Sequence, residues 1–448
     1  MKYRKLSTAI FFSVSLCIFS QDKWSLDECV SYALEHNLQL NDFKYTALSN
    51  KETYRQSIRN VLPNVNGFAD YNIRFGRSVD PNDNSIINTD FFSNNYSLES
   101  SIDLFQGFQK INAIKAAKFL YKATQEETLQ QKYLLAFRVM SAFYDIQFYE
   151  GLLAISREQQ LVSQANYDLV DKQIELGLKA GADLYEAESI LLTDKLKVTQ
   201  SNNQLVAAKL ALIQEMNLEG VTDINILPIM GEPDKNTIDF SVVADSVYLE
   251  AKTFMPIIKA QELRTRAAKK DIAVARGALY PSISLFGGYG TGFYETTRDT
   301  IGETVPFKDQ FRDNTFRYVG VSINVPISNG WSGRSKVKQQ KISLMRAQNN
   351  LDVQEQELRQ TIEQLVQEHN ALQVEYQQSS QKMASQELAF NIAQKRFEKG
   401  LINTLDLLTA KNLFASAQNE NLQVRLRSEI NKSTLDFYRG LPVFTINK

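Results

Sequence analysis

The sequence predicts a mainly α-helical protein with membrane β-strands, built as two tandem repeats that each join a β-hairpin to long antiparallel helices. Three observations predict this fold class. The segment GLKAGADLYEA, which starts at Gly177, has a counterpart in GLINTLDLLTA from Gly400, 223 residues later. Four shorter segments alternate apolar and polar residues with the period of a β-strand. Two segments of about 70 residues contain no proline and are rich in helix-forming residues.

Composition excludes several classes of partner. With 50 basic and 51 acidic residues the chain has a net charge of −1, whereas nucleic-acid binding normally leaves a basic excess. No nucleic-acid partner is therefore expected. No internal apolar run approaches the roughly 20 residues of a membrane-spanning helix, so any crossing of a membrane after maturation would be made by strands.

Residues 1–20 are predicted to form a secretory signal peptide, because basic residues precede a short apolar core and cleavage fits after Ser20. A short N-terminal membrane anchor is the alternative, although the apolar core is short for one. Cys17 would be removed with this segment, and the bulky Leu16 before it suits lipid attachment poorly. Cys29 would then be the last remaining cysteine, so no intrachain disulfide is expected.

Both repeats show the same order of elements. In each, a helical segment ends before a proline, Pro63 or Pro281, because the residue before proline is pushed out of helical geometry. Each second strand runs towards a glycine beside an aromatic residue, Gly107 or Gly330, again 223 residues apart. These four residues mark the predicted junctions between strands and helices. The predicted segments are an N-terminal helix (21–62), a first β-hairpin (63–106), a first helical hairpin (107–216, tip at 177–183), an inter-repeat segment (217–245), the first helix of the second repeat (246–280), a second β-hairpin (281–329), a second helical hairpin (330–438, tip at 400–406) and a C-terminal tail (439–448).

The strand segments each have two distinct faces. From 92 to 104 the even-numbered residues are mostly apolar and the odd-numbered ones are all polar, and 319–327 and 65–75 follow similar patterns. The segment 281–293 is rich in glycine and has a poorly marked polar face. This alternation has an ordinary explanation, an antiparallel sheet with one face on a core and one in water. A length of about 10–12 residues also fits tilted transmembrane strands.

Three features favour the membrane interpretation. A signal peptide directs export, aromatic residues lie near the strand ends, and the connections 76–91 and 294–315 are long and polar, as extracellular loops are. Four strands cannot close a barrel, and open strand edges are not tolerated in lipid. Two copies would give eight strands around an interior filled by side chains, whereas three would give twelve around water. We therefore expect an obligate oligomer in contact with membrane lipid, and favour a trimer.

The two glycine segments are predicted to be turns between long helices and returning helices. Gly177 and Gly400 can adopt the left-handed geometry that ends a helix. Asp183 and Asp406 then fall in the first turn of the returning helix, where a carboxylate complements the helix N-terminus. Capping explains both residues, but the apolar neighbours of Asp406 favour a functional role for it.

The duplicated order of elements, with strands that begin at proline, strands that run to glycine and Gly-Leu tips, resembles the TolC-like outer-membrane efflux proteins. The resemblance covers nearly the whole mature chain, including WSLDECVSYALEHNLQL near its start. It implies a homotrimer with a 12-stranded outer-membrane β-barrel and a 12-helix periplasmic α-barrel. It also implies partners: a periplasmic adaptor (membrane fusion) protein and an inner-membrane transporter, which together with this channel would export small molecules or proteins from a Gram-negative cell.

The resemblance implies a pore constriction or gate at the tips. Asp406 would belong to an acidic ring, and Asp183 would take part in gating contacts. Thr409 stands where some family members have a second aspartate, and Ile402 where some have a basic residue. Lys179, two residues after the first glycine, is the basic residue of this chain at a tip. A double acidic ring and an arginine gate are therefore not carried over.

Two other functions fit the sequence less well. A periplasmic coiled-coil adaptor or structural tether with a soluble β-domain would normally have one helical hairpin, not two. An enzyme is disfavoured because the two histidines, His36 and His369, lie in polar helical segments, and because GGYGTG at 287–292 lacks the lysine of a phosphate-binding loop and opens no helix. No cofactor, metal site or catalytic residue is predicted.

Overall fold

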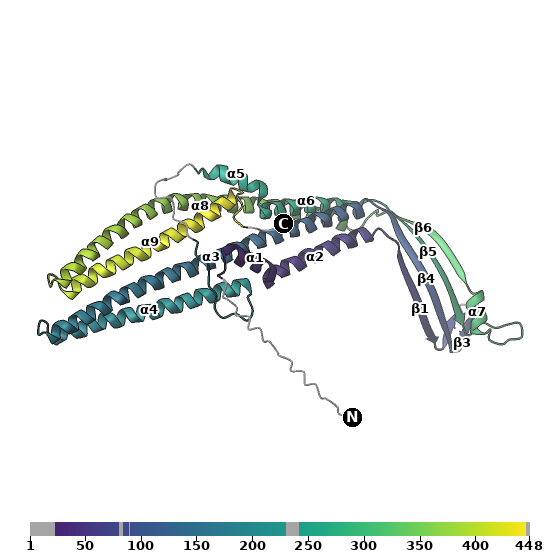
Figure 1. Cartoon of the computed structure of the whole chain (residues 1–448). Helices are drawn as coiled ribbons and strands as arrows, with labels where there is room; N and C mark the ends of the chain where they lie inside the picture. Colours follow the sequence, from purple (N-terminus) through teal and green to yellow (C-terminus); the bar gives the residue numbers. More distant parts are fainter. Residues whose placement is uncertain (1–22, 80–83, 89, 230–241, 445–448) are drawn as a thin grey trace, which may run out of the picture. The chain divides into compact units, whose positions relative to one another are not determined.

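The computed structural model describes residues 23–79, 84–88, 90–229 and 242–444 (Figure 1). The predicted signal peptide with Cys17, residues 230–241 of the inter-repeat segment and the end of the tail lie outside these residues. The chain divides into two compact units. The sheet unit comprises residues 42–130 and 252–359, and the tip unit comprises the described residues of 1–41, 131–251 and 360–448.

The sheet unit contains one antiparallel sheet in the order β1-β4-β5-β6 (Figure 1). Strands of the two repeats share this sheet, because β4 from the first repeat pairs with β5 from the second. The outer strands β1 and β6 each have one unpaired edge in the single copy. The strands are β1 (Asn64–Arg74), β4 (Phe91–Gln106), β5 (Ser282–Tyr294) and β6 (Phe316–Asn324).

The strand register confirms the alternation of the two faces. Cross-strand partners such as Val65 and Ser100, or Leu285 and Val321, place one mostly apolar face on all four strands. In the single copy much of this face is exposed, with Val319 at 82%. An ordinary half-buried sheet would cover its apolar face, so the exposure favours membrane strands.

The glycine-rich segment of β5 is explained by aromatic rings that lie over it. A Cβ atom at Gly288 would contact the ring of Tyr318, and one at Gly290 would contact the ring of Phe316. Across the same pair of strands, the ring of Phe286 covers Gly320. The glycines therefore make room for rings on the polar face of the sheet, and they are strand residues rather than a phosphate-binding loop.

The connections contain elements that the sequence analysis did not predict. A short hairpin of β2 (Arg77–Val79) and β3 (Ile86–Asn88) follows β1, and helix α7 (Phe307–Asp313) precedes β6. The buried Gln310 of α7 accepts a hydrogen bond from the backbone N–H of Tyr294 and donates to its carbonyl oxygen. The last strand ends at Asn324, short of the expected residue 327, because Pro326 cannot donate to the ladder.

Each segment that precedes a hairpin forms two helices instead of the single predicted one. The first contains α1 (Leu26–His36) and α2 (Leu38–Arg59), and the second contains α5 (Ala244–Phe254) and α6 (Pro256–Gly277). Asn37 separates the first pair, where its side chain accepts a hydrogen bond from the N–H of Leu40 and starts a new helix. Pro256 separates the second pair, since proline is favoured at the first position of a helix.

The long helices form two antiparallel hairpins, one in each repeat (Figure 1). They are α3 (Gln109–Glu175) with α4 (Gly181–Met216), and α8 (Ser332–Glu398) with α9 (Thr404–Tyr438). Together with the shared sheet, these hairpins confirm the predicted two-repeat fold class. Among the described residues, no helix combines the length and apolar character needed to cross a bilayer.

The core of the tip unit includes a cluster in which α1 packs on α3 and α4. Cys29 of α1 is fully buried beside residues such as Phe143 and Leu212. Burial is the main cause that raises the pKa of the Cys29 thiol to about 12, so this cysteine is an unreactive core residue. A second cluster joins all four long helices near the tips and includes Phe390, which stacks on Phe414 with ring centroids 5.7 Å apart.

Both junctions between a second strand and a long helix have the same backbone turn. Gly107 (φ +56°) is followed by Phe108 (φ +62°), and Gly330 (φ +60°) by Trp331 (φ +66°). Positive φ costs little for glycine but is strained for an aromatic residue. The two glycines differ in their surroundings, because a Cβ at position 107 would overlap the carbonyl oxygen of Gly277, whereas position 330 is open.

This difference predicts unequal effects of two matched substitutions. Gly330→Ala should lower the free energy of unfolding by about 1 kcal/mol, the cost of a left-handed alanine. Gly107→Ala should cost more, because it adds a clash with backbone to the same strain. Thermal unfolding in detergent, followed by circular dichroism, measures both. Gly67→Ala, in β1 with open space around it, is the control; equal losses for Gly107→Ala and Gly330→Ala would contradict the structure.

Candidate functional site at the helix tips

The two helix tips have the same turn geometry. Gly177 has φ +72°, its N–H donates to the carbonyl of Ile174 at 2.8 Å, and the next residue, Leu178, donates to Gln173 at 2.8 Å. Gly400 has φ +70°, and an equivalent pair of 2.9 Å hydrogen bonds runs from residues 400 and 401 back to 397 and 396. This is the Schellman arrangement, which uses glycine to satisfy the last carbonyls of a helix.

The two tip aspartates have different environments. The carboxylate of Asp183 accepts a hydrogen bond from the N–H of Ala180 at 3.1 Å, so it caps α4. At the other tip, Asn403 is the capping residue, because its side chain accepts from the N–H of Asp406 at 2.8 Å. The carboxylate of Asp406 is exposed, and within the described part of the chain it has no hydrogen bond or ion pair. Capping therefore accounts for Asp183 but not for Asp406.

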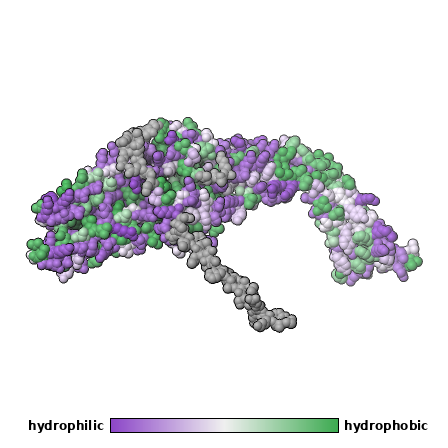
Figure 2. All heavy atoms as spheres, in the orientation of Figure 1, coloured by the Kyte–Doolittle hydropathy of each residue, from purple (hydrophilic) through white to green (hydrophobic). Residues whose placement is uncertain are grey.

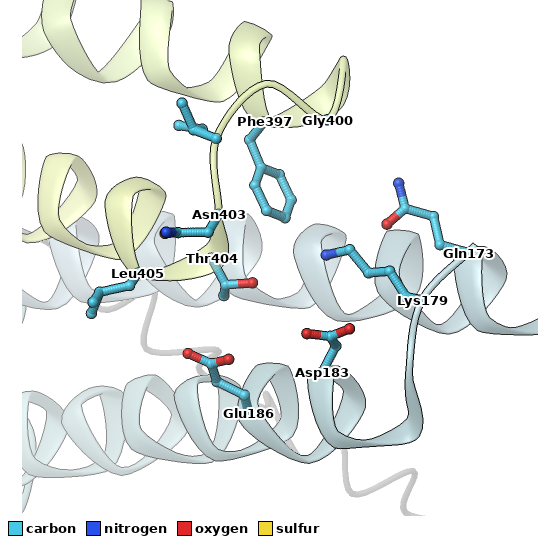
Figure 3. A pocket seen from close by; sticks show the side chains of 10 residues that line it. Gln173, Lys179, Asp183, Glu186, Phe397, Gly400, Asn403, Thr404 and Leu405 are labelled. Atoms are coloured by element: carbon cyan, nitrogen blue, oxygen red, sulfur yellow. The ribbon is translucent and has the colours of Figure 1, made fainter. Parts of the chain in front are cut away.

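A pocket of about 410 Å³ lies between the two tips, inside the tip unit (Figure 3). Lys179 extends from the first tip towards the second, where its ammonium group lies 5.0 Å from the ring centroid of Phe397. The carboxylates of Asp183 and Glu186 point into the same pocket from α4 (Figure 3). The other lining residues are Gln173, Gly400, Ile402, Asn403, Thr404 and Leu405.

The structure thus brings together some of the predicted site residues and not others. Lys179 and Asp183 share the tip pocket, whereas Asp406 and Thr409 are not among its lining residues. The hydroxyl of Thr409 donates to the carbonyl of Leu405 at 2.8 Å, an ordinary contact inside a helix. A cation–π contact between Lys179 and Phe397 links the tips at this pocket, and such a contact is worth roughly 0.5–2 kcal/mol depending on its exposure.

A stronger polar contact lies deeper between the hairpins. Lys411 of α9 donates to the carboxylate of Asp194 in α4 and, at 2.7 Å, to the hydroxyl of Ser163 in α3. Ser163 in turn donates to Asp194. The side chains of Lys411 and Asp194 are only 3% and 1% exposed. We call Ser163, Asp194 and Lys411 the buried ion cluster.

Pairing of the two charges offsets the cost of burying Asp194 and Lys411. Burial opposes ionisation of Asp194, but hydrogen bonds from Lys411 and Ser163 outweigh it and hold the pKa of this carboxyl below its ordinary value. Burial lowers the pKa of Lys411, and its contact with Asp194 acts in the opposite direction. Removing one partner of such a pair is costly, because the other charge stays buried without compensation.

This cluster was not predicted from the sequence, although the sequence contains a signal for it. Lys411 follows Leu407 by four residues and precedes Phe414 by three, so it lies on the buried stripe of α9. Asp194 follows Leu191 by three residues and Ala187 by seven, so it lies on the buried stripe of α4. A charged residue on an apolar stripe indicates a buried partner, but the stripe does not identify that partner.

The remaining candidate residues have ordinary structural environments. His36 stacks on Tyr32 with ring centroids 4.0 Å apart, and His369 forms a hydrogen bond with Gln373. Over the ranges that the structure describes, no group of three or more His, Cys, Asp or Glu side chains could hold a metal ion.

The buried ion cluster predicts a large effect of a conservative substitution. Asp194→Asn should lower the free energy of unfolding by about 3–5 kcal/mol, because it leaves Lys411 buried without an opposite charge. Chemical denaturation in detergent measures the loss. Glu420→Gln is a matched control, since Glu420 pairs with Lys382 across the second hairpin but both side chains are about half exposed. That variant should lose less than about 1 kcal/mol.

The double variant Asp194→Leu, Lys411→Met should recover much of the lost free energy of unfolding, because it removes both charges.

The depressed pKa of Asp194 also determines how the stability depends on pH. Its ionised form contributes stability that is fully present above the pKa of an unfolded aspartate and is lost as the pH falls through the lower folded value. The parent should therefore have a higher free energy of unfolding than Asp194→Asn above about pH 5, and this difference should shrink in stronger acid. A difference of under 1 kcal/mol at pH 7 would show that the cluster carries no charge pair.

Known proteins provide an independent comparison. The family model of the outer membrane efflux protein matches residues 30–217 and 248–441, one match in each repeat. The chain is 22% identical to the outer membrane efflux protein BepC of Brucella suis, over 70% of this chain and 65% of BepC. It is 26% identical to the outer membrane protein OprJ of Pseudomonas aeruginosa, over 60% of this chain and 55% of OprJ. The chain thus spans about half to two thirds of the length of these relatives.

A solved structure shows the same fold. The CmeC outer membrane channel of Campylobacter jejuni superposes with a TM-score of 0.78 at 13% identity, covering 98% of this chain and 93% of CmeC. The match of the family model to most of both repeats shows that the chain belongs to the outer membrane efflux protein family.

Proposed function

We propose that three copies of this chain form the outer-membrane channel of a tripartite efflux or type I secretion system. The observation that carries the proposal is the open four-stranded sheet, which has an exposed apolar face and an unpaired edge on both β1 and β6. Unpaired backbone groups are not tolerated in lipid, so these edges must pair with other copies. Twelve strands from three copies would enclose a water-filled interior.

In this arrangement each face of the sheet has a function. The apolar face, which includes Val319 and Val321, contacts lipid, and the polar face, which includes Asn66 and Glu99, lines the channel. The long hairpins of three copies would form the twelve-helix periplasmic tunnel. Membership of the family supports an outer-membrane location in a Gram-negative cell.

The helix tips form the gate in this proposal. A ring of three Asp406 carboxylates at the narrow end would attract cations and disfavour anions. The exposed, unpaired carboxylate supports this role for Asp406, whereas Asp183 stays with its helix cap. Opening requires the tips to separate, and a periplasmic adaptor coupled to an inner-membrane transporter would drive it by binding the separated state more tightly.

The contacts of the tip unit suggest where the hairpins separate. At the pocket, the tips are joined by the cation–π contact between Lys179 and Phe397, beside the apolar cluster that includes Phe390 and Phe414, and a few helical turns away by the buried ion cluster. The cation–π contact is weak, whereas the buried ion cluster is expensive to break. The tips should therefore part at the pocket while Lys411 keeps its hydrogen bonds to the first hairpin.

The alternative function of a periplasmic adaptor or tether fits less well. Such a protein would have one helical hairpin and a soluble β-domain, whereas this chain has two helical hairpins and a four-stranded sheet that both repeats share. The family match over both repeats supports the channel.

The oligomeric state tests the proposal directly. Light scattering of the protein purified in detergent, with the detergent mass subtracted, should give three times the mass of the processed chain, whose unprocessed mass is 51.0 kDa. A monomer that is soluble without detergent would mean that the apolar face is covered in another way, and would rule out the channel.

Charge selectivity tests the role of Asp406. Asp406→Asn should reduce the preference of reconstituted channels for cations over anions, because three negative charges leave the constriction. The shift of the reversal potential in a salt gradient measures this preference. Glu175→Gln, which removes an exposed carboxylate at the end of α3, is the control. An unchanged potential for Asp406→Asn, with channels otherwise intact, would remove Asp406 from the constriction.

A further inference from the structure

The helix ends beside the sheet concentrate positive charge. We define the basic collar as the ten residues of each helix that lie nearest the strands: 50–59 of α2, 109–118 of α3, 268–277 of α6 and 332–341 of α8. These segments contain 13 Lys and Arg but only two acidic residues, a net charge of +11. The whole chain has a net charge of −1, so the collar is balanced by negative charge elsewhere.

The opposite ends of the long hairpins lack this excess. The ten residues at each end that borders a tip, 166–175, 181–190, 389–398 and 404–413, sum to a net charge of −4. Positive charge is therefore a property of the helix ends next to the strands rather than of long helices in this chain.

Most of the positive charge in the collar is unpaired. Arg55 and Arg59 pair with Glu52, and Lys110 pairs with Asp103. The other ten cationic side chains of the collar make no ion pair with any carboxylate that the structure describes. Lys115 and Lys118 of α3, for example, are exposed to solvent.

At the starts of α3 and α8 this arrangement is unfavourable in the isolated chain. Helix N-termini favour acidic residues, yet α3 and α8 have none in their first turn. Lysines three residues apart, such as Lys338 and Lys341, repel each other on a helix surface. A partner with negative charge would relieve this repulsion.

The position of the collar indicates which anion it meets. Exposed aromatic residues mark both junctions with the sheet, with Phe108 at 62%, Tyr280 at 58% and Trp331 at 69% exposure. Figure 2 shows hydrophobic residues gathered where these helices meet the strands. In membrane barrels, aromatic residues collect at the level of the lipid headgroups. Ten residues of helix cover about 15 Å, so the collar begins at that level and extends only a short way into the periplasm.

A direct contact links the basic collar to the exposed aromatic residues. The guanidinium of Arg334, in the first turn of α8, lies 4.5 Å from the ring centroid of Trp331. This cation–π contact holds a positive charge beside the exposed aromatic ring, where a lipid phosphate would lie. A ligand inside the channel would not account for charge held beside a lipid-level aromatic residue.

We propose that the basic collar binds the phosphate groups of anionic phospholipids in the periplasmic leaflet of the membrane that the strands cross. This proposal rests on the proposed channel function, which places the sheet in that membrane. The bound lipids would neutralise the collar and fix the depth of the strands in the bilayer, because the charges of one leaflet face a ring of Lys and Arg.

Lipid binding by the full chain, purified as its detergent-solubilised oligomer, tests the proposal. Native mass spectrometry would compare binding of phosphatidylglycerol and of zwitterionic phosphatidylcholine at low and high salt. The parent should prefer phosphatidylglycerol, and the preference should weaken with salt. The variant Lys336→Gln, Lys338→Gln, Lys341→Gln should lose more than tenfold in that preference, since each lysine near an anionic surface contributes about fivefold.

The matched control is Lys172→Gln, Lys195→Gln, Lys399→Gln, three exposed lysines of the tip unit. It removes the same charge and should keep the preference. Equal binding of the two lipids by the parent, or an unchanged preference in the collar variant, would overturn the proposal. Full competition by soluble glycerol phosphate would also overturn it, because the surface would then recognise phosphate without a membrane. A three-copy channel that shows no lipid preference would leave the proposed function standing, whereas a soluble monomer would refute that function itself.

Discussion

Backbone N–H and C=O groups at the edge of a sheet have no partner inside lipid, and the rest of this structure depends on that constraint. One chain provides four strands, shared equally by its two repeats, and leaves β1 and β6 with an open edge each. Among the described residues, the rest of the chain is mainly helical and supplies no strand to these edges. In the proposed channel, assembly from copies therefore follows, and each copy supplies only part of the tunnel wall.

The two repeats have the same backbone turns but differ in the side chains at these turns. Both tips turn at a left-handed glycine, and both strand–helix junctions use a glycine followed by a strained aromatic residue. The variation appears in the side chains that the turns present. The first tip has Lys179 and a capping Asp183, whereas at the second Asn403 takes over the cap and leaves Asp406 exposed. Side chains at equivalent positions of the two tips can therefore have different roles, because the glycine turn does not depend on those side chains.

Charge occurs in three settings along the helices. Paired, buried charge joins the hairpins at Asp194 and Lys411, a cation–π contact joins them at the pocket, and unpaired positive charge collects at the ends next to the sheet. These three settings differ in solvent access, and solvent access decides what a charge contributes. Buried charge makes a firm link, half-exposed charge makes a weak one, and exposed charge is available to a partner.

The sequence by itself determined the two repeats, the alternation of the strands, the long hairpins and the glycine turns, because each follows from local periodicity or backbone preference. It also indicated the need for other copies, which follows from counting strands. Tertiary structure alone decided the hydrogen bonds of Gln310 in α7, the pocket between Lys179 and Phe397, and the pairing of Lys411 with Asp194. The last two partners are 217 residues apart in the chain. A local pattern can show that a charged residue is buried, but its partner is chosen by the packing of helices that the sequence places far apart.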